Sequence, residues 1–139
     1  MARRRLETYE DYDRALRQGY GLGELAGYTP WIRVQDVSSL GQSSKPPGIK
    51  MDRKHHLLSN NEKHVFLLIE RDKSVLDIRE QFPLLPLDLT VRIANELGIK
   101  HPITRKGRIP AVRTIDFLLT LTVRDVKTYG AIAVKEASE

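Results

Sequence analysis

The sequence predicts an α/β fold in which a small mixed sheet is flanked by helices. Two kinds of segment support this prediction: runs rich in β-branched and aromatic residues, typical of strands, and capped runs with an apolar stripe, typical of helices. In the second half of the chain these segments read, in order, helix, strand, helix, strand, turn and strand. At 139 residues the chain is long enough for one domain with a modest core.

The strongest strand pattern lies in the last third of the chain. Val112–Val123 carries apolar residues on one face, and Ala131–Lys135 is a second strand-like run. The polar, glycine-ended segment Arg124–Gly130 between them is the predicted turn. Folded as an antiparallel hairpin, this region brings Asp116 opposite the segment around Val134, to within about a residue of register.

Two helices have clear terminal signals. Thr8–Gln18 has its first residue, Thr8, as a candidate N-cap and is followed by Gly19 as a stop. In the next helix Ser59 is the N-cap, and Glu62, three residues on, completes a capping box. Both helices therefore begin with a side chain able to satisfy a free backbone N–H group.

Three further elements are read from local patterns. Val75–Phe82 is predicted to be a strand, and Trp31–Val34 a short strand. Leu89–Leu97 is predicted to be a helix, with Asp88 as its cap and Gly98 as its C-terminal stop.

Composition narrows the class of protein. The chain carries 23 Lys and Arg against 18 Asp and Glu, and its net charge of +5 suits a polyanionic partner, although many ordinary proteins share it. Cysteine is absent, which excludes disulfides and thiolate metal sites. The charged N-terminus lacks the apolar core of a signal peptide, and apolar runs such as Val65–Ile69 are too short to span a membrane. We therefore expect a soluble cytoplasmic protein with no membrane partner.

Basic residues gather in loops. One predicted loop, Ser38–Lys54, is followed by a basic cluster, and another basic loop precedes Val112–Val123. These loops could contact phosphates or could be ordinary solvated surface, and the residues alone leave both interpretations open. The candidate phosphate contacts are Lys50, Arg53, Lys54, Lys100, His101, Arg105, Lys106 and Arg113.

Two acids and a lysine could converge at one edge of the sheet: Glu62, Asp116 and Lys135. Such a set suits metal-assisted phosphodiester hydrolysis, because carboxylates hold a hard cation that polarises the phosphate, and a lysine offsets charge on the phosphorus. Each residue also has a plainer interpretation: Glu62 as a helix cap only, Asp116 as a surface residue, and Lys135 as a solvated side chain. From the hairpin alone, the plainer interpretation is the commoner one.

Several stretches, in a consistent order from about Tyr28 onward, resemble the TnsA family, the endonuclease subunits of heteromeric cut-and-paste bacterial transposons. They are Ser59-Asn60-Asn61-Glu62, Val75-Leu76-Asp77-Ile78-Arg79-Glu80-Gln81-Phe82-Pro83-Leu84, Gly98-Ile99-Lys100-His101-Pro102, Thr114-Ile115-Asp116-Phe117 and Val134-Lys135. The resemblance implies an N-terminal helix and linker at 1–27 and a restriction-endonuclease-like catalytic core at 28–139. It also implies magnesium-dependent cutting, with manganese as a substitute, of double-stranded DNA at the 5′ ends of a transposon. The implied bacterial partners are a DDE transposase, TnsB, which cuts the 3′ ends, and an ATPase regulator, TnsC.

By position, the resemblance assigns Glu62 and Asp116 as catalytic, metal-binding acids and Lys135 as the catalytic lysine. Ala133 departs from the family, which places an acid or an amide two residues before that lysine; a methyl group binds no metal. Either the Val134 carbonyl and water complete the metal site, or Ala133 is an inactivating substitution. The chain ends four residues after Lys135, where the family continues with more core elements and a winged-helix-type domain, so a core truncated at its C-terminal end is expected.

Three functions follow from these observations. The first is a transposon-end endonuclease. The second is a non-catalytic, DNA-binding structural subunit of a transpososome, motivated by Ala133 and the early end. The third is a generic basic nucleic-acid-binding domain in which Glu62 only caps its helix; the sparse aromatic residues argue against an RNA-stacking module.

Overall fold

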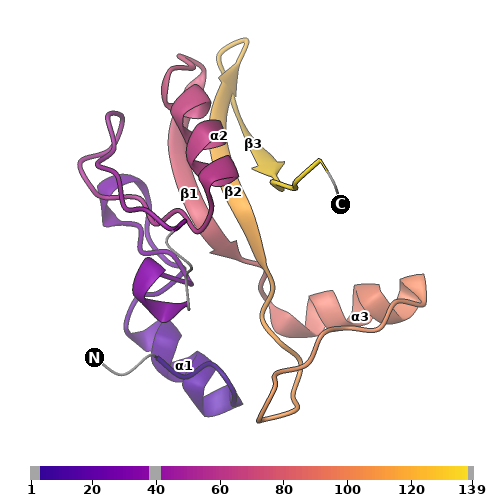
Figure 1. The fold of residues 1–139 in the computed structure, drawn as a ribbon. Coiled ribbons are helices and arrows are strands. Elements are labelled where there is room, and N and C mark those ends of the chain that lie inside the picture. The colour runs from indigo at the N-terminus through magenta and orange to yellow at the C-terminus, as the bar shows by residue number, and fades with distance from the viewer. Residues whose placement is uncertain (1–3, 38–41, 138–139) are drawn as a thin grey trace.

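The computed structural model describes residues 4–37 and 42–137 and has the predicted α/β class. Its elements are α1 (Tyr9–Arg17), the 3-10 turns η1 (Leu25–Gly27) and η2 (Val34–Asp36), α2 (Asn60–Glu70), β1 (Val75–Pro83), α3 (Leu87–Leu97), β2 (Thr114–Val123) and β3 (Val126–Ile132). The described strands form a three-stranded sheet in the order β1-β2-β3, and both pairings are antiparallel. The parallel pairing expected of a mixed sheet does not occur among these strands. Helix α2 lies across the sheet, whereas α3 extends away from one end of it (Figure 1).

The core between α2 and the sheet confirms the predicted apolar pattern. Phe66 and Ile69 of α2 pack with Ile78 of β1 and with Phe117 and Leu119 of β2. The alternating residues of β2 therefore turn one face toward the helix, as its period of two requires. Ser59 caps α2 as predicted, because its hydroxyl accepts the N–H of the third helical residue.

The β2–β3 turn is much tighter than predicted. Val123 pairs with Val126, so only Arg124 and Asp125 connect the strands, with φ values of 50° and 63°. Two residues with positive φ make the kind of hairpin turn whose twist matches the flanking strands. The predicted seven-residue turn Arg124–Gly130 is wrong for a physical reason: β3 is a largely solvated strand, so its sequence lacks the apolar alternation that marks a half-buried one.

Both outer ends of the hairpin also differ from the prediction. The strand predicted at Ala131–Lys135 is wrong in its bounds, because β3 ends at Ile132 and residues 133–135 follow it in irregular structure. The shorter turn shifts the strand toward the N-terminus of the segment. At the other end of the hairpin, β2 begins at Thr114, two residues after the predicted start at Val112.

The N-terminal region forms a second small core. Tyr12 and Ala15 of α1 pack against Trp31, which is 1% exposed, and against Leu87 at the start of α3. The predicted helix and its Thr8 N-cap are confirmed, and the Asp11 side chain completes a capping box that was not predicted. The predicted boundary between 27 and 28 stays a prediction, although backbone bonds such as Gly21 N–H to Thr29 O (2.6 Å) cross it.

Two local predictions are wrong. Trp31–Val34 is not a strand, because Trp31 is buried in the second core and the Asp36 carboxylate accepts the Arg33 N–H (2.9 Å), which closes a turn there. Helix α3 begins at Leu87, so Asp88 lies in its first turn and does not cap it. Pro86 occupies the N-cap position instead and makes no side-chain hydrogen bond to the helix. The predicted end at Gly98 is confirmed by its left-handed φ of 68°.

The long loop before α2 is partly ordered by pairing. Residues 38–41 of the predicted loop Ser38–Lys54 lie outside the described part of the chain. From residue 42 onward, bridges join Ser44 to Leu57 and Pro47 to Lys54, so the loop folds back on itself. Within the described ranges, no helix combines the length and apolar character needed to cross a membrane.

Candidate active site

Glu62 also contacts a side chain outside its own helix. Its side chain lies in the first turn of α2 and is 7% exposed. One carboxylate oxygen accepts from the Ser59 hydroxyl (2.8 Å) and the other from the Gln81 side-chain amide (3.2 Å). Burial raises the pKa of Glu62; the Ser59 hydrogen bond opposes this, and the charge of Asp116 raises the pKa further. The two acids therefore lie close enough to repel each other.

Asp116 is held against the segment that follows β3. Its Oδ2 accepts the backbone N–H of Val134 at 2.6 Å. This contact confirms the predicted approach of Asp116 to Val134, although the strand bounds behind that prediction were wrong. A carboxylate fixed by a backbone N–H keeps a defined position, which a metal ligand or an acid catalyst requires.

The acid and the lysine share one groove. Asp116, Ala133 and Lys135 line a hollow of about 710 Å³ beside α3, with Arg113 and His101 also on its wall. Lys135 is exposed, so its ammonium group is accessible from the groove. A carboxylate, an ammonium and further basic groups thus face one space large enough for part of a nucleic-acid backbone.

The oxygen donors are fewer than a complete three-acid site would offer. Across the described ranges, no group of three or more His, Cys, Asp or Glu side chains could hold a metal ion. Ala133 is exposed and supplies only a methyl group. Glu62, Asp116 and the Val134 carbonyl remain as donors. Mg²⁺ is usually held by one or two carboxylates and keeps several waters, so its chemistry does not require a third acid.

The basic candidates do not form one cluster. His101 and Arg113 reach the groove of Asp116, whereas Arg105 and Lys106 line a different hollow beside α1. His101 is also hydrogen bonded within the fold, through Thr90 Oγ1 (3.0 Å) and the Pro102 carbonyl (2.9 Å). The other candidates lie on two separate loops: Lys50 is half-buried, and Lys54 and Lys100 are exposed.

Arg53 has a role that the sequence did not predict. Its guanidinium donates to both carboxylate oxygens of Glu80 (2.7 and 3.0 Å) and to the Ile78 carbonyl (2.8 Å), and its side chain is 9% exposed. A guanidinium saturated in this way is not available to a phosphate, so the structure argues against the predicted DNA contact. Burial alone would raise the pKa of Glu80, but hydrogen bonds from His55 and Arg53 outweigh it and lower that pKa to about 2.

Sequence reasoning also missed Gln81. This residue is 4% exposed, donates to Glu62, and accepts from the Thr114 hydroxyl (2.9 Å). Gln81 lies within one of the stretches that carry the family resemblance, but no spacing rule marks a single amide in a strand as part of a site.

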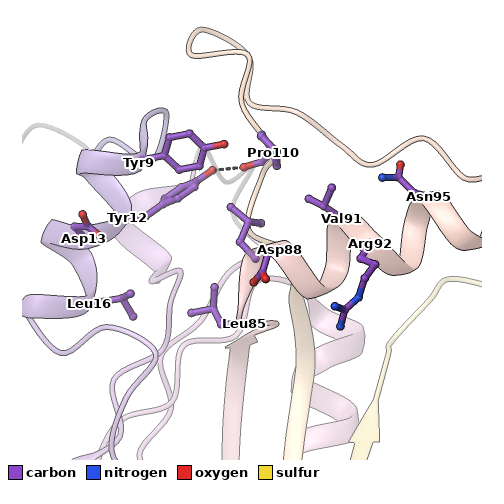
Figure 2. A pocket seen from close by; sticks show the side chains of 11 residues that line it. Tyr9, Tyr12, Asp13, Leu16, Leu85, Asp88, Val91, Arg92, Asn95 and Pro110 are labelled. Atoms are coloured by element: carbon purple, nitrogen blue, oxygen red, sulfur yellow. Dashed lines mark hydrogen bonds between the residues drawn. The ribbon is translucent and has the colours of Figure 1, made fainter.

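A second groove, of about 560 Å³, lies between α1 and α3 and has a different character (Figure 2). Tyr12, Leu16 and Leu85 give it a largely apolar wall, and the Tyr12 hydroxyl donates to the Pro110 carbonyl (2.9 Å) at its edge. It shares no lining residue with the groove of Asp116. It is therefore separate from the proposed chemistry.

Comparison with known proteins agrees with the resemblance. Residues 72–139 match the family model described as TnsA-like endonuclease N terminal. The chain is 46% identical over 125 residues to the transposon Tn7 transposition protein TnsA of Escherichia coli, an alignment that covers 90% of this chain and 44% of that protein. The chain thus spans less than half the length of this relative. The range matched by the family model includes Asp116, Ala133 and Lys135.

Proposed function

We propose that the chain, which is similar to the TnsA-like family over residues 72–139, is a metal-dependent DNA endonuclease that cuts the 5′ ends of a transposon. The observation that carries the proposal is the hydrogen bond from the Val134 N–H to Asp116, at 2.6 Å. This bond holds the Ala133-Val134-Lys135 segment against the acid, and Lys135 lines the same groove as Asp116. Glu62, whose pKa is raised in part by the charge of Asp116, supplies the second carboxylate.

The residues divide the chemistry of phosphodiester hydrolysis between them. Glu62 and Asp116 would hold Mg²⁺ or Mn²⁺, with the Val134 carbonyl as a further oxygen donor. When bound there, the ion would supply Lewis-acid chemistry, by polarising the scissile phosphate and lowering the pKa of a water. Lys135 would offset the negative charge that grows on the phosphorus oxygens and would help to orient the attacking water.

The partners follow from the same family. The substrate would be double-stranded DNA at transposon ends in the bacterial cytoplasm, cut together with the DDE transposase TnsB under control of the ATPase TnsC. The groove of Asp116 offers Arg113 and His101 toward the DNA backbone. Phosphate contacts elsewhere would come from Lys50, Lys54, Lys100, Arg105 and Lys106. Basic side chains at such contacts release counterions, so the affinity for DNA would fall as salt rises.

Ala133 supports a second candidate, a non-catalytic DNA-binding subunit of the transpososome. The Ala133 methyl group leaves the site without a third metal-binding side chain. A site that lacks this ligand could bind DNA without cutting it. The two functions differ in one measurable property, strand cleavage, because both predict binding of transposon ends.

The decisive experiment is cleavage of labelled transposon-end DNA, with the partner transposase, in magnesium and in manganese. The chain would be compared with its Ala133→Glu and Ala133→Gln forms, with Asp116→Ala as the control that should not cut. Cutting by the unchanged chain would support the nuclease with the Val134 carbonyl and water as ligands. Cutting only by the Glu or Gln form would mean that Ala133 inactivates a genuine nuclease. End binding without cutting by any form would reject the nuclease and leave the structural subunit.

A further inference from the structure

Gln81 has an unusual backbone conformation for a residue inside a strand. Its φ is 45°, in the left-handed region that non-glycine residues rarely adopt. Such a conformation is unfavourable and persists where the surrounding structure fixes it. Here the Gln81 carbonyl accepts from the Trp31 N–H (3.1 Å), and the buried Tyr28 hydroxyl, which is closer to the Glu80 carbonyl (2.7 Å), also lies 3.2 Å from it.

This conformation changes which way two neighbouring side chains point. Successive side chains of a regular strand lie on opposite faces of the sheet. In β1, however, Glu80 contacts His55, whose ring packs on Phe66 of α2, while the next residue, Gln81, contacts Glu62 of α2. The left-handed residue therefore brings the Gln81 amide to the side of the sheet where Glu62 lies.

Both ends of the amide are used. Nε2 donates to Glu62 Oε1 (3.2 Å), and Oε1 accepts from the Thr114 hydroxyl (2.9 Å). Thr114 lies on β2, two residues before Asp116. A single buried amide thus links the helix that carries one acid to the strand that carries the other. Removing it would leave a carboxylate oxygen of Glu62 and the Thr114 hydroxyl without these partners.

We propose that Gln81 is the positioning residue of this site: its amide fixes the Glu62 carboxylate relative to Asp116, so that both acids can hold one divalent cation. An amide suits this task because it donates a hydrogen bond without adding charge. A carboxylate in its place would repel Glu62, and an apolar side chain would leave Glu62 with the Ser59 hydroxyl as its remaining side-chain partner. The inference rests on the proposed function, because it gives Gln81 a role at the same metal site.

The test is binding of Mn²⁺ to the full chain, followed by the loss of the free-ion EPR signal. Gln81→Met keeps the length of the side chain and removes both hydrogen bonds. Outer-shell partners of metal ligands typically change affinity by about 10- to 100-fold, so we expect Mn²⁺ to bind about 10-fold more weakly. Thr114→Val, which removes only the hydroxyl that holds the amide, should give a smaller loss. Gln35→Met, at an exposed position of η2, is the matched control and should bind Mn²⁺ as the unchanged chain does.

The outcomes separate positioning from mere support of the fold. Each variant is compared at a temperature where circular dichroism shows it folded. A Gln81→Met form that melts earlier yet binds Mn²⁺ with unchanged affinity would overturn the inference while leaving the nuclease proposal intact. If Gln81→Met does not fold, unchanged affinity in Thr114→Val overturns it in the same way. No Mn²⁺ binding by the unchanged chain would refute the proposed metal site and, with it, this role of Gln81.

Discussion

Replacing Arg53 with methionine removes the guanidinium that neutralises a buried carboxylate, and we expect a large loss of stability. Glu80 is fully buried, and Arg53 donates to both of its carboxylate oxygens. Hydrogen bonds from His55 and Arg53 overcome the effect of burial and lower the pKa of Glu80 from 4.5 to about 2. A difference of this size corresponds to about 3 kcal/mol of folding stability at neutral pH.

Breaking such a pair from one side is more damaging than removing it altogether. The Arg53→Met form leaves Glu80 buried without its main partner, for which about 3–5 kcal/mol is typical. The double variant Arg53→Met with Glu80→Gln carries no uncompensated charge, so part of the loss should return. Lys54→Met is the control, because Lys54 is the next residue in the same loop and is exposed.

The assay is urea unfolding followed by circular dichroism at pH 7, with the free energy of unfolding obtained by linear extrapolation. The pH dependence provides a second readout. Because the folded-state pKa of Glu80 lies below its ordinary value, its contribution is complete above about pH 4.5 and is lost as the pH falls toward 2. The stability difference between the unchanged chain and the double variant should narrow over that interval. A loss in Arg53→Met no larger than in Lys54→Met would refute the reasoning.

Three further predictions concern the site and the hairpin. Glu62→Gln should stabilise the metal-free protein at pH 7, because burial and the charge of Asp116 disfavour the charged form of Glu62 and raise its pKa. The gain in the free energy of unfolding should shrink as the pH is lowered toward 4.5. If urea unfolding at several pH values shows no gain, that would argue against this repulsion. Asp125→Gly should raise the melting temperature by an amount equivalent to roughly 0.5–1 kcal/mol, because glycine adopts a positive φ without steric conflict; destabilisation would argue against the tight turn. Millimolar Mg²⁺ should raise the melting temperature of the unchanged chain but not that of Asp116→Ala, when NaCl is used to match the ionic strength; equal shifts in the two forms would contradict binding at Asp116.

Features set by neighbouring residues were predictable from the sequence. The Ser59 and Thr8 caps, the glycine after α1 and the apolar alternation of β2 all depend on contacts within a few residues. The tight turn at Arg124-Asp125 was missed because the residues near it carry no such local signal. Neither residue is the glycine that usually marks such a turn, and β3 is too solvated to show where it begins.

The candidate site was predictable only in part. The approach of Asp116 to Val134 follows from the hairpin. The predicted turn was too long, but Asp116 and Val134 still lie opposite each other in the structure. The placement of Glu62 required the resemblance to TnsA, because a capping pattern explains the same residue without any catalytic role. No local pattern predicts that Arg53 pairs with Glu80, since that contact depends on how a loop packs against a strand 27 residues away.

Gln81 shows why residues that support a site are harder to predict than the acids in it. A carboxylate near a basic loop already suggests chemistry, so a search for functional residues finds it by type. An amide in a strand carries no such signal, and its role depends on one backbone angle that turns it toward α2. The Gln81 carbonyl is held by the backbone N–H of Trp31, a residue that the sequence placed in a short strand and not in a packed core. The N-terminal region therefore influences the proposed site through the conformation of a single residue in β1, in addition to Ile32, which lines the groove of Asp116.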